Sequence, residues 1–267
     1  MKKIEIEEIK KIQLDILMSV HTFCMNKGIE YLLTGGTAIG AIRHGGYIPW
    51  DDDIDIAMTR PNYEKFLESF NNKDNYLRVF APELSLNYYA PYANVCDMRT
   101  VVKENQVGHN GQQIGIKIDI FPIDGVINER DYFKRKRICD ACNRIMGVKR
   151  LIIRDYSCLQ RIRYLVLKSI FCLIPYSILQ SIIHKQATKY AFDNCDFAAA
   201  LTFPNKKPML YKTQWFNNYI DICFEGETLR IIKNYDLYLR VIYGDYLQMP
   251  PVDQQVASHG FDAYWID

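Results

Sequence analysis

Residues 35–58 read GGTAIGAIRHGGYIPWDDDIDIAM, and this stretch contains Asp51, Asp52, Asp53 and Asp55 between apolar residues. Like charges this close repel one another, and a carboxylate inside a fold is destabilising unless a cation or hydrogen bonds compensate it. The stretch therefore predicts that a positive group binds beside these aspartates.

The residues before this stretch predict a helix followed by a strand. Apolar residues recur at helical spacing from Ile9 to Phe23 and stop before Gly28, which predicts an amphipathic helix whose apolar face lies in the core. Residues 29–33 predict a short buried strand that runs into Gly35 and its neighbour.

The stretch itself predicts a short helix and then a strand. We expect Thr37 to cap a helix that runs to His44 and ends at the following glycine pair. Residues 54–58 predict a second strand, and Pro61 opens a further helix that continues to Phe70.

A third strand is predicted further along the chain, in GIKIDIFPIDG (residues 115–125). Its isoleucines alternate, which places Asp119 on the opposite, less apolar face. We expect Pro122 and the Asp124-Gly125 pair to end this strand.

The strand aspartates predict a metal site. Side chains alternate along a strand, so Asp53 and Asp55 share one face, and Asp119 can join them from another strand. Three carboxylates suit a hard divalent ion such as Mg²⁺ or Mn²⁺ that also binds phosphate oxygens. A calcium-binding EF-hand loop is excluded, because counting from Asp51 its sixth and twelfth positions hold Ile56 and Asn62.

The paired glycines predict an anion site next to these acids. Gly35 and Gly36 have no side chains and allow the backbone to approach a ligand closely. Amide groups at the start of the following helix, around Thr37, point toward an anion. The interpretation as ordinary turns and a solvated acidic edge remains the alternative for any short motif of this kind.

Three segments together resemble one family: YLLTGGTAIGAIRHGGYIPWDDDIDIAM, KIDIFPIDG and NYDLYLRVIYGDYLQMP. They are similar to the LicD family of phosphotransferases over residues 29–67, 114–126 and 224–259. That family resembles a branch of the nucleotidyltransferase superfamily related to fukutin and fukutin-related protein, and its best-known members move phosphocholine from CDP-choline to a cell-surface glycan. Departures are Ile232, where the family often has proline, and the segment 131–192, which matches no family motif.

The resemblance implies roles for individual residues. The metal-binding pair falls on Asp53 and Asp55, with Asp51 as an adjoining acid and Asp119 as the third carboxylate. The donor-phosphate turn falls on Gly35, Gly36 and Thr37. By position, Arg43 and His44 either contact donor phosphate or have a surface role. The candidate aromatic residues for a choline head are Tyr88, Tyr89 and Tyr92, and Tyr243, Asp245 and His259 have a role either in the site or in packing.

Pattern and resemblance together predict an α+β fold, with a nucleotidyltransferase-like mixed sheet flanked by helices. We expect a catalytic core over residues 1–130, a basic helical lobe over 131–200 and a C-terminal segment over 201–267 that packs back on the core. Two interpretations of the lobe stay open: a helical unit with a solvated basic face, and a basic amphipathic hairpin on an anionic membrane surface.

Composition restricts the partners and the compartment. A net charge of +2 gives no reason to expect nucleic acid as a partner. The N-terminus lacks the apolar core of a secretory signal, and the 8 scattered cysteines fit reduced thiols. We therefore expect a cytoplasmic enzyme, peripheral to the inner membrane face if the hairpin interpretation holds. It would transfer a phospho-alcohol, most simply phosphocholine from a CDP-alcohol donor such as CDP-choline, to a glycan of lipopolysaccharide or teichoic acid type. The alternatives are nucleotidyl transfer from a nucleoside triphosphate and an inactive membrane-associated adaptor.

Overall fold

A computed structural model describes residues 1–70, 76–85, 88–104, 113–152, 157–204, 208–256 and 260–266. The helices are α1 (Ile6–Lys27), α2 (Gly35–His44), α3 (Arg60–Ser69), α4 (Glu129–Arg150), α5 (Cys158–Phe171), α6 (Tyr176–Ala187) and α7 (Tyr235–Tyr243). The strands are β1 (Lys3–Ile4), β2 (Leu32–Leu33), β3 (Asp55–Thr59), β4 (Leu77–Phe80), β5 (Ala93–Asp97), β6 (Thr100–Glu104), β7 (Ile116–Val126), β8 (Phe197–Ala199), β9 (Tyr211–Lys212), β10 (Tyr219–Phe224), β11 (Glu227–Ile232) and β12 (Phe261–Trp265).

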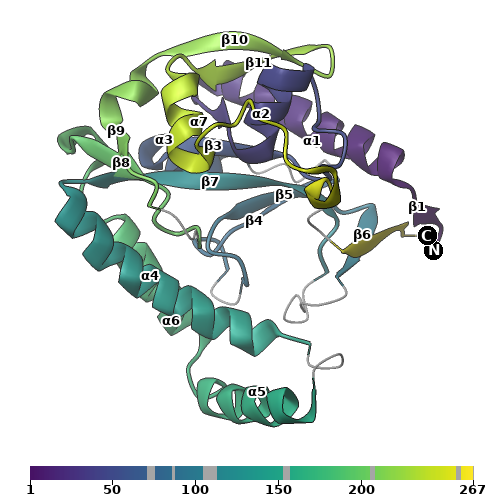
Figure 1. Ribbon diagram of the computed structural model, residues 1–267, viewed down its shortest axis with the longest axis vertical. Helices are drawn as coiled ribbons and strands as arrows, with labels where there is room; N and C mark the ends of the chain where they lie inside the picture. The colour runs from purple at the N-terminus through teal and green to yellow at the C-terminus, as the bar shows by residue number, and fades with distance from the viewer. Residues whose placement is uncertain are drawn as a thin grey trace.

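The main sheet has the order β2-β3-β7-β5-β4, and β8 and β9 extend it from β7. Only the β3–β7 pair in this sheet, as far as the structure describes it, is parallel; the other pairs are antiparallel. Figure 1 shows α1, α2, α3 and α7 on one side of β7, and α4 and α6 on the other. The predicted mixed sheet flanked by helices is confirmed.

Strand β7 is longer than the sequence predicts. It continues through Pro122 and Asp124 to Val126. Along one edge, β5 pairs with residues 116–120 and β8 pairs with residues 124–126, so Pro122 falls in the gap between these two partners. A proline there removes no hydrogen bond from that edge, and the prediction that it ends the strand is wrong.

The predicted helices are present, and their ends follow from local chemistry. Helix α1 ends at Gly28, which has the left-handed φ of 58° that favours glycine at a C-cap. Helix α3 opens with Pro61 in its first turn. Helix α2 begins at Gly35 with Thr34 at the N-cap position. The prediction that Thr37 caps this helix is therefore wrong.

Part of the basic region is structural rather than solvated. The Arg135 guanidinium is buried in α4 and donates to the backbone oxygens of Gly125 and Gln186, each at 2.8 Å. Lys136 is also buried and pairs with Asp140. The Arg135 bonds fasten α4 to β7 and α6, because a buried cation needs such partners.

A buried ion pair joins α3 to the sheet. The Arg60 Nε donates to Asp124 Oδ1 at 2.7 Å, and both side chains are inaccessible or nearly so. Asp124 lies on β7 after Asp119, toward the end of the strand, and its pair with Arg60 belongs to the core.

The division into regions 1–130, 131–200 and 201–267 remains a prediction. Helices α4 to α6 fall in the second region, but its last strand, β8, pairs with β7 of the first. The strands nearest the two ends of the chain lie together in a separate sheet of order β1-β12-β6, and Figure 1 shows both termini there.

Within the described residues, no single helix has the length and apolar character needed to cross a bilayer. Helices α5 and α6 meet that criterion only as a pair, and they bend by 78° at the break between them.

Candidate functional site

Two of the predicted aspartates lie side by side on the parallel strands. Asp55 begins β3, and its register partner on β7 is Asp119. The Asp119 N–H donates to the Ile54 backbone oxygen at 2.9 Å, which fixes this register. Neighbouring strands are about 4.8 Å apart, so the two carboxylates leave the sheet as close neighbours. Ile54 and Ile56 are fully buried beside them.

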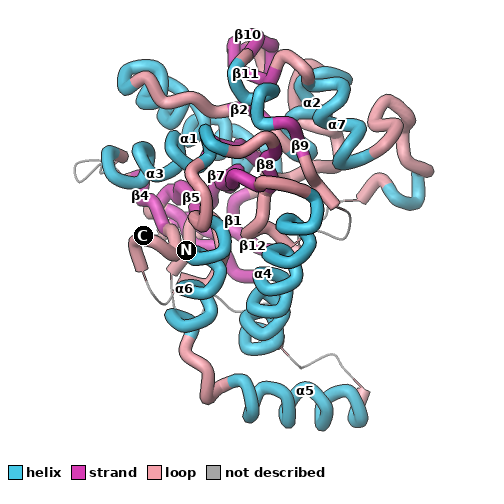
Figure 2. The backbone as a smooth tube through the Cα atoms, turned by 90° about the vertical axis from the view of Figure 1, so that its left-hand side faces the viewer, coloured by secondary structure: helices cyan, strands magenta, loops and turns pink. Residues whose placement is uncertain are grey.

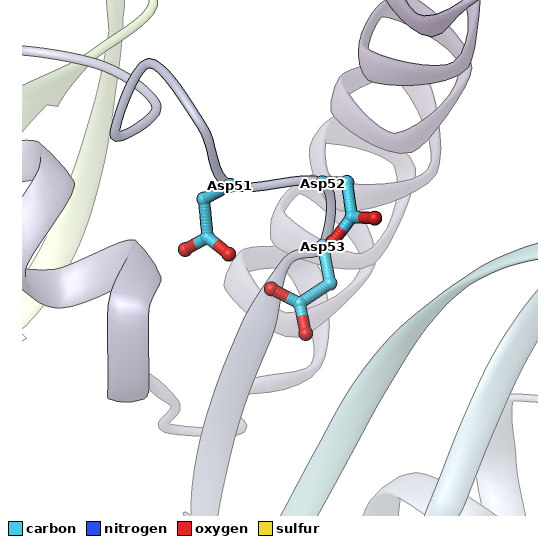
Figure 3. A group of neighbouring side chains, drawn as sticks. All are labelled: Asp51, Asp52 and Asp53. Atoms are coloured by element: carbon cyan, nitrogen blue, oxygen red, sulfur yellow. The ribbon is translucent and has the colours of Figure 1, made fainter. Parts of the chain in front are cut away.

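The remaining acids lie on the loop that enters β3. One carboxylate oxygen from each of Asp51, Asp52 and Asp53 lies within 4.8 Å of the others. Figure 3 shows the Asp51 and Asp53 carboxylates directed to the same side of the loop. Asp52 is buried, and its backbone oxygen accepts a hydrogen bond from Gln13 of α1 at 3.0 Å. The loop is thus held against α1 while it presents acidic groups.

The glycine turn at the start of α2 lies directly against these acids. Gly35 has a φ of 60°, and a Cβ atom there would lie 2.5 Å from Asp55 Oδ2. A Cβ atom at Gly36 would overlap Asp51 Oδ2. Only glycine leaves room for the carboxylates at this distance from the backbone. Thr37 is buried, and its Oγ1 accepts a hydrogen bond from the Asp55 N–H at 2.8 Å, which ties the turn to β3.

Asp55 lies among like charges. Burial raises the pKa of Asp55 well above its usual range, and the neighbouring Asp53 and Asp119 carboxylates raise it further, while Lys117 opposes them. A site that concentrates like charges in this way favours a cation as its partner.

A lysine and an amide support Asp119, and sequence analysis did not assign either to the site. Lys117 forms an ion pair with Asp119 Oδ1, and the Asn94 side-chain amide donates to the same oxygen. Although burial lowers it, the Asp119 charge raises the pKa of Lys117 well above its usual range. Lys117 lies two residues before Asp119 on the same strand face, a spacing visible in the sequence. Asn94 comes from β5 and carries no such signal.

Part of the predicted ligand set meets the geometry of a divalent metal site. Carboxylate oxygens of Asp51, Asp52 and Asp53 come within 4.8 Å of one another, and Asp55 lies in register with Asp119 on the neighbouring strand. All of these groups are oxygen donors, which Mg²⁺ and Mn²⁺ prefer, and a single ion shared by Asp51, Asp53, Asp55 and Asp119 stays a prediction. A bound cation would relieve the repulsion that Asp53, Asp119 and Asp51 exert on Asp55.

Arg43 and His44 lie at the opposite end of α2 from the glycine turn. Arg43 comes eight positions after Gly35 in the helix, about 12 Å further along its axis. Arg43 donates to the backbone oxygen of Tyr246 at 2.9 Å and to His44 Nε2 at 3.0 Å. The structure does not bring these two residues to the aspartates, and their contact with donor phosphate stays a prediction.

Two of the tyrosines considered for a choline head lie near Asp119. The Tyr88 hydroxyl donates to Asn94, whose amide donates to Asp119, and Tyr88 and Tyr89 share a buried cluster. Tyr92 packs against Phe121, with ring centroids 4.5 Å apart, and burial together with the Asp119 charge raises its pKa well above its usual range. A role for these three residues at a choline head stays a prediction.

A different set of aromatic residues surrounds a cavity of about 90 Å³ that begins at Asp55. The aromatic rings come from strand β7, from the segment after β8, from β9 and from α7, so no short stretch of sequence predicts this cavity. The aromatic residues are Phe121, Phe203, Tyr211, Tyr238 and Tyr243.

The three C-terminal candidates, Tyr243, Asp245 and His259, have different outcomes. Tyr243, at the end of α7, lines the cavity and is 42% exposed, which places it at the rim. Asp245 lies just beyond α7 on the surface. His259 falls outside the described residues.

Comparisons with known proteins agree with this arrangement. A family profile described as "LicD/FKTN/FKRP, nucleotidyltransferase domain" matches residues 28–141. The chain is 30% identical to the lipopolysaccharide cholinephosphotransferase LicD of Haemophilus influenzae, over 99% of each chain. A shorter similarity, 52% over 31 residues, links it to human ribitol 5-phosphate transferase FKRP, covering 12% of this chain and 6% of that protein.

The profile match contains every aspartate of the cluster and the glycine turn. The similarity to the Haemophilus influenzae protein extends over nearly the whole of both chains. With the site and the full length both matched, the chain belongs to the LicD family.

Proposed function

We propose that this protein transfers phosphocholine from CDP-choline to a hydroxyl group of a cell-surface glycan, or of its lipid-linked precursor, and releases CMP. The observation that carries this proposal is the pairing of Asp55 with Asp119 beside a glycine turn that opens a helix. The Haemophilus influenzae relative, a lipopolysaccharide cholinephosphotransferase by name, supports choline as the transferred alcohol and a lipopolysaccharide-type glycan as the acceptor.

In this proposal Asp51, Asp53, Asp55 and Asp119 hold Mg²⁺ or Mn²⁺. When bound, such an ion neutralises charge on the transferring phosphate and on the leaving oxygen. The first N–H groups of α2, at Gly35 and its neighbours, have no intrahelical acceptor and carry partial positive charge. They are suited to bind the donor diphosphate, with Thr37 fixing the turn to β3.

The reaction forms one P–O bond and breaks another. The acceptor oxygen attacks the phosphorus that carries choline, and the bond from that phosphorus to the bridging oxygen breaks, so that CMP leaves with the bridging oxygen. We assign the hydroxyl proton to Asp119, because its Oδ1 is already bound by Lys117 and Asn94, which hold the carboxylate in place. Positioning and electrostatic stabilisation account for most of the rate in transfers of this kind.

Calorimetric titration tests the proposal. CDP-choline, CDP-ribitol, CDP-glycerol and ATP are titrated into the protein, once with Mg²⁺ and once with a chelator. We expect Mg²⁺-dependent binding of CDP-choline in preference to the other ligands, and release of CMP when a glycan acceptor is added. Mg²⁺-dependent preference for another CDP-alcohol would keep the reaction class and replace the donor.

A matched pair of variants separates chemistry from folding. Asp53→Asn should abolish CMP release, whereas Asp253→Asn changes an exposed aspartate outside the cluster and should leave it intact. Full activity in Asp53→Asn would contradict the assignment of the site.

Nucleotidyl transfer is the second candidate, because the matching family profile is described as a nucleotidyltransferase domain. In that reaction the acceptor attacks the α-phosphorus of a nucleoside triphosphate and pyrophosphate leaves. The same carboxylates would serve both reactions, so the products decide between them. Binding of ATP alone, with pyrophosphate as product, would favour this alternative, and no binding by any donor would favour an adaptor.

A further inference from the structure

The cavity beside Asp55 has an unusual lining for a space next to a phosphate site. Among the described residues that line it are five aromatic residues and one carboxylate, that of Asp55, and none of these described lining residues is a lysine or arginine. Its volume of about 90 Å³ corresponds to roughly three water molecules, which suits a small group rather than a sugar ring.

The rings hold one another in place. The ring centroids of Tyr211 and Tyr238 are 4.6 Å apart, and those of Phe121 and Phe203 are 4.8 Å apart. The Tyr238 hydroxyl forms a hydrogen bond of 2.6 Å with Thr34 Oγ1, at the N-cap position of α2. The aromatic wall is thereby fastened to the same turn that holds the acids.

A quaternary ammonium group matches this lining. It has no N–H to donate, and it is attracted by the faces of aromatic rings and by a nearby negative charge. In choline only two carbon atoms separate the nitrogen from the oxygen that is bonded to phosphorus. A pocket for the ammonium must therefore begin next to the phosphate site, as this cavity begins at Asp55.

We propose that Phe121, Phe203, Tyr211, Tyr238 and Tyr243 form the pocket for the trimethylammonium group of the donor. The inference rests on the proposed phosphotransfer and specifies the alcohol. A polyol such as ribitol or glycerol would leave its hydroxyl groups against ring faces, so the pocket selects choline over these alcohols.

Substitutions at the rim test the pocket without disturbing the core. Tyr243→Leu keeps an apolar side chain but removes the ring, at a position 42% exposed. Tyr235→Leu, on the same helix but not among the lining residues, is the matched control. Phe203→Leu is a second variant inside the cavity. Binding of CDP-choline and CDP-glycerol is measured by calorimetry in the presence of Mg²⁺, and thermal unfolding verifies that each variant is folded.

We expect Tyr243→Leu to weaken CDP-choline binding by about two- to thirtyfold, while CDP-glycerol changes less than twofold. Tyr235→Leu should leave both unchanged. The pocket proposal would be overturned if Tyr243→Leu and Phe203→Leu each weakened the binding of CDP-choline and CDP-glycerol equally. It would also be overturned if the wild type bound CDP-glycerol tightly and did not bind CDP-choline. In either case the proposed phosphotransfer would stand. Failure of every CDP-alcohol to bind would instead overturn the proposed function.

Helix α5 carries a second, independent inference. None of its residues is buried, and Figures 1 and 2 both show it at one end of the molecule, beyond α4 and α6. Leu159, Ile162, Val166 and Ile170 recur at helical spacing and are each at least 53% exposed, so they form an apolar stripe facing away from the protein.

The charge around the stripe indicates what covers it. Arg163 lies beside the stripe on the helix surface, and residues 157–192 contain no aspartate or glutamate. We propose that α5 lies on an anionic lipid surface, with the stripe among the acyl chains and Arg163 at the headgroups. A glycan acceptor carried on a lipid would then be brought to the enzyme in the same plane.

Vesicle cosedimentation tests this second inference. The full chain is mixed with vesicles of phosphatidylcholine alone or with added phosphatidylglycerol, at low and high salt. The variant Ile162→Asp with Val166→Asp interrupts the stripe, and Val252→Asp is the control, because Val252 is 82% exposed on another surface.

We expect binding to the anionic vesicles only, weakened by salt and reduced at least tenfold in the double variant but not in the control. No binding by the wild type, or equal binding by the double variant, would overturn the inference. Concentration-dependent dimers that the double variant abolishes, with no vesicle binding, would replace the lipid with a second copy of the chain.

Discussion

Replacing Asp55 with asparagine should make the metal-free protein more stable while abolishing its activity. Asp55 lies partly buried between Asp53 and Asp119, and only Lys117 opposes their repulsion among these neighbours. Asparagine keeps nearly the same shape and removes the charge. The substitution therefore relieves repulsion in the fold and at the same time removes a ligand of the proposed metal site.

The size of the effect follows from the spacing of the strands. Carboxylates on adjacent strands lie roughly 5 Å apart, and at an effective dielectric constant of about 20 each like-charged pair contributes roughly 3 kcal/mol of repulsion. Asp119 lies at this spacing from Asp55 across the strands, and Asp53 and Asp51 on the preceding loop add to the repulsion, while attraction to Lys117 offsets part of it. After partial screening by solvent, we expect a net gain of about 2 kcal/mol in the free energy of unfolding, or a rise of roughly 5 °C in the melting temperature.

Thermal unfolding with and without Mg²⁺ measures this effect. In a chelator, Asp55→Asn should melt above the wild type, whereas Asp253→Asn should melt with it. Adding Mg²⁺ should raise the melting temperature of the wild type and not that of Asp55→Asn, because only the wild type retains the full ligand set. A lower melting temperature of Asp55→Asn in the chelator would refute the electrostatic reasoning, and retained turnover would refute the catalytic role.

Three further predictions concern the ion pair, the turn and the thiols. Arg60→Ala should destabilise the protein by about 3–5 kcal/mol at pH 8 in urea unfolding, because it leaves Asp124 buried without its partner. Burial raises the pKa of Asp124 to about 6 even beside Arg60, and without Arg60 this pKa should be higher still. The Asp124 carboxyl of the variant therefore takes up a proton on acidification, and the loss in free energy of unfolding relative to the wild type should be smaller at pH 5 than at pH 8. The same loss at both pH values would contradict this reasoning. Gly35→Ala should lower the free energy of unfolding by about 1–2 kcal/mol, because Gly35 has a positive φ, and should lower turnover about a hundredfold by displacing Asp55. Gly28→Ala is the control: Gly28 has a similar φ but open space around it, so this variant should lose stability and keep its turnover. Equal turnover in both variants would refute the contact between Gly35 and Asp55. A thiol reagent should modify three cysteines rapidly in the native protein, and fast reaction of a fourth would contradict the burial of the others; the exposed thiols are those of Cys158, Cys172 and Cys223.

The sequence predicts the strands that carry Asp55 and Asp119, because period-two alternation is a local property. The parallel register then brings the two aspartates together. The start of α2 is not predicted, because the helix begins at Gly35 and not after Thr37. Sequence analysis fails where an outcome depends on distant partners. Pro122 remains within a strand because two different strands share that edge of β7.

The residues that sequence analysis did not find depend on tertiary contacts. Arg135 belongs to a basic run by composition, yet carbonyl groups from β7 and α6 bury it. The rings of the cavity come from segments as far apart as Phe121 and Tyr243, and nothing in either segment points to the other. The amide of Asn94 meets Asp119 only because β5 pairs with β7.

The sheet that joins the ends of the chain determines an order of assembly during synthesis. Lys3 of β1 pairs with Tyr264 of β12, so β1 cannot pair with β12 until that much later part of the chain has been made. The five strands β2, β3, β4, β5 and β7 lie within residues 32–126 and can pair while the rest of the chain is still being made. Closing so long a loop is entropically slow compared with local pairing. The strands that carry Asp55 and Asp119 are therefore assembled early, and the separate β1-β12-β6 sheet forms after them.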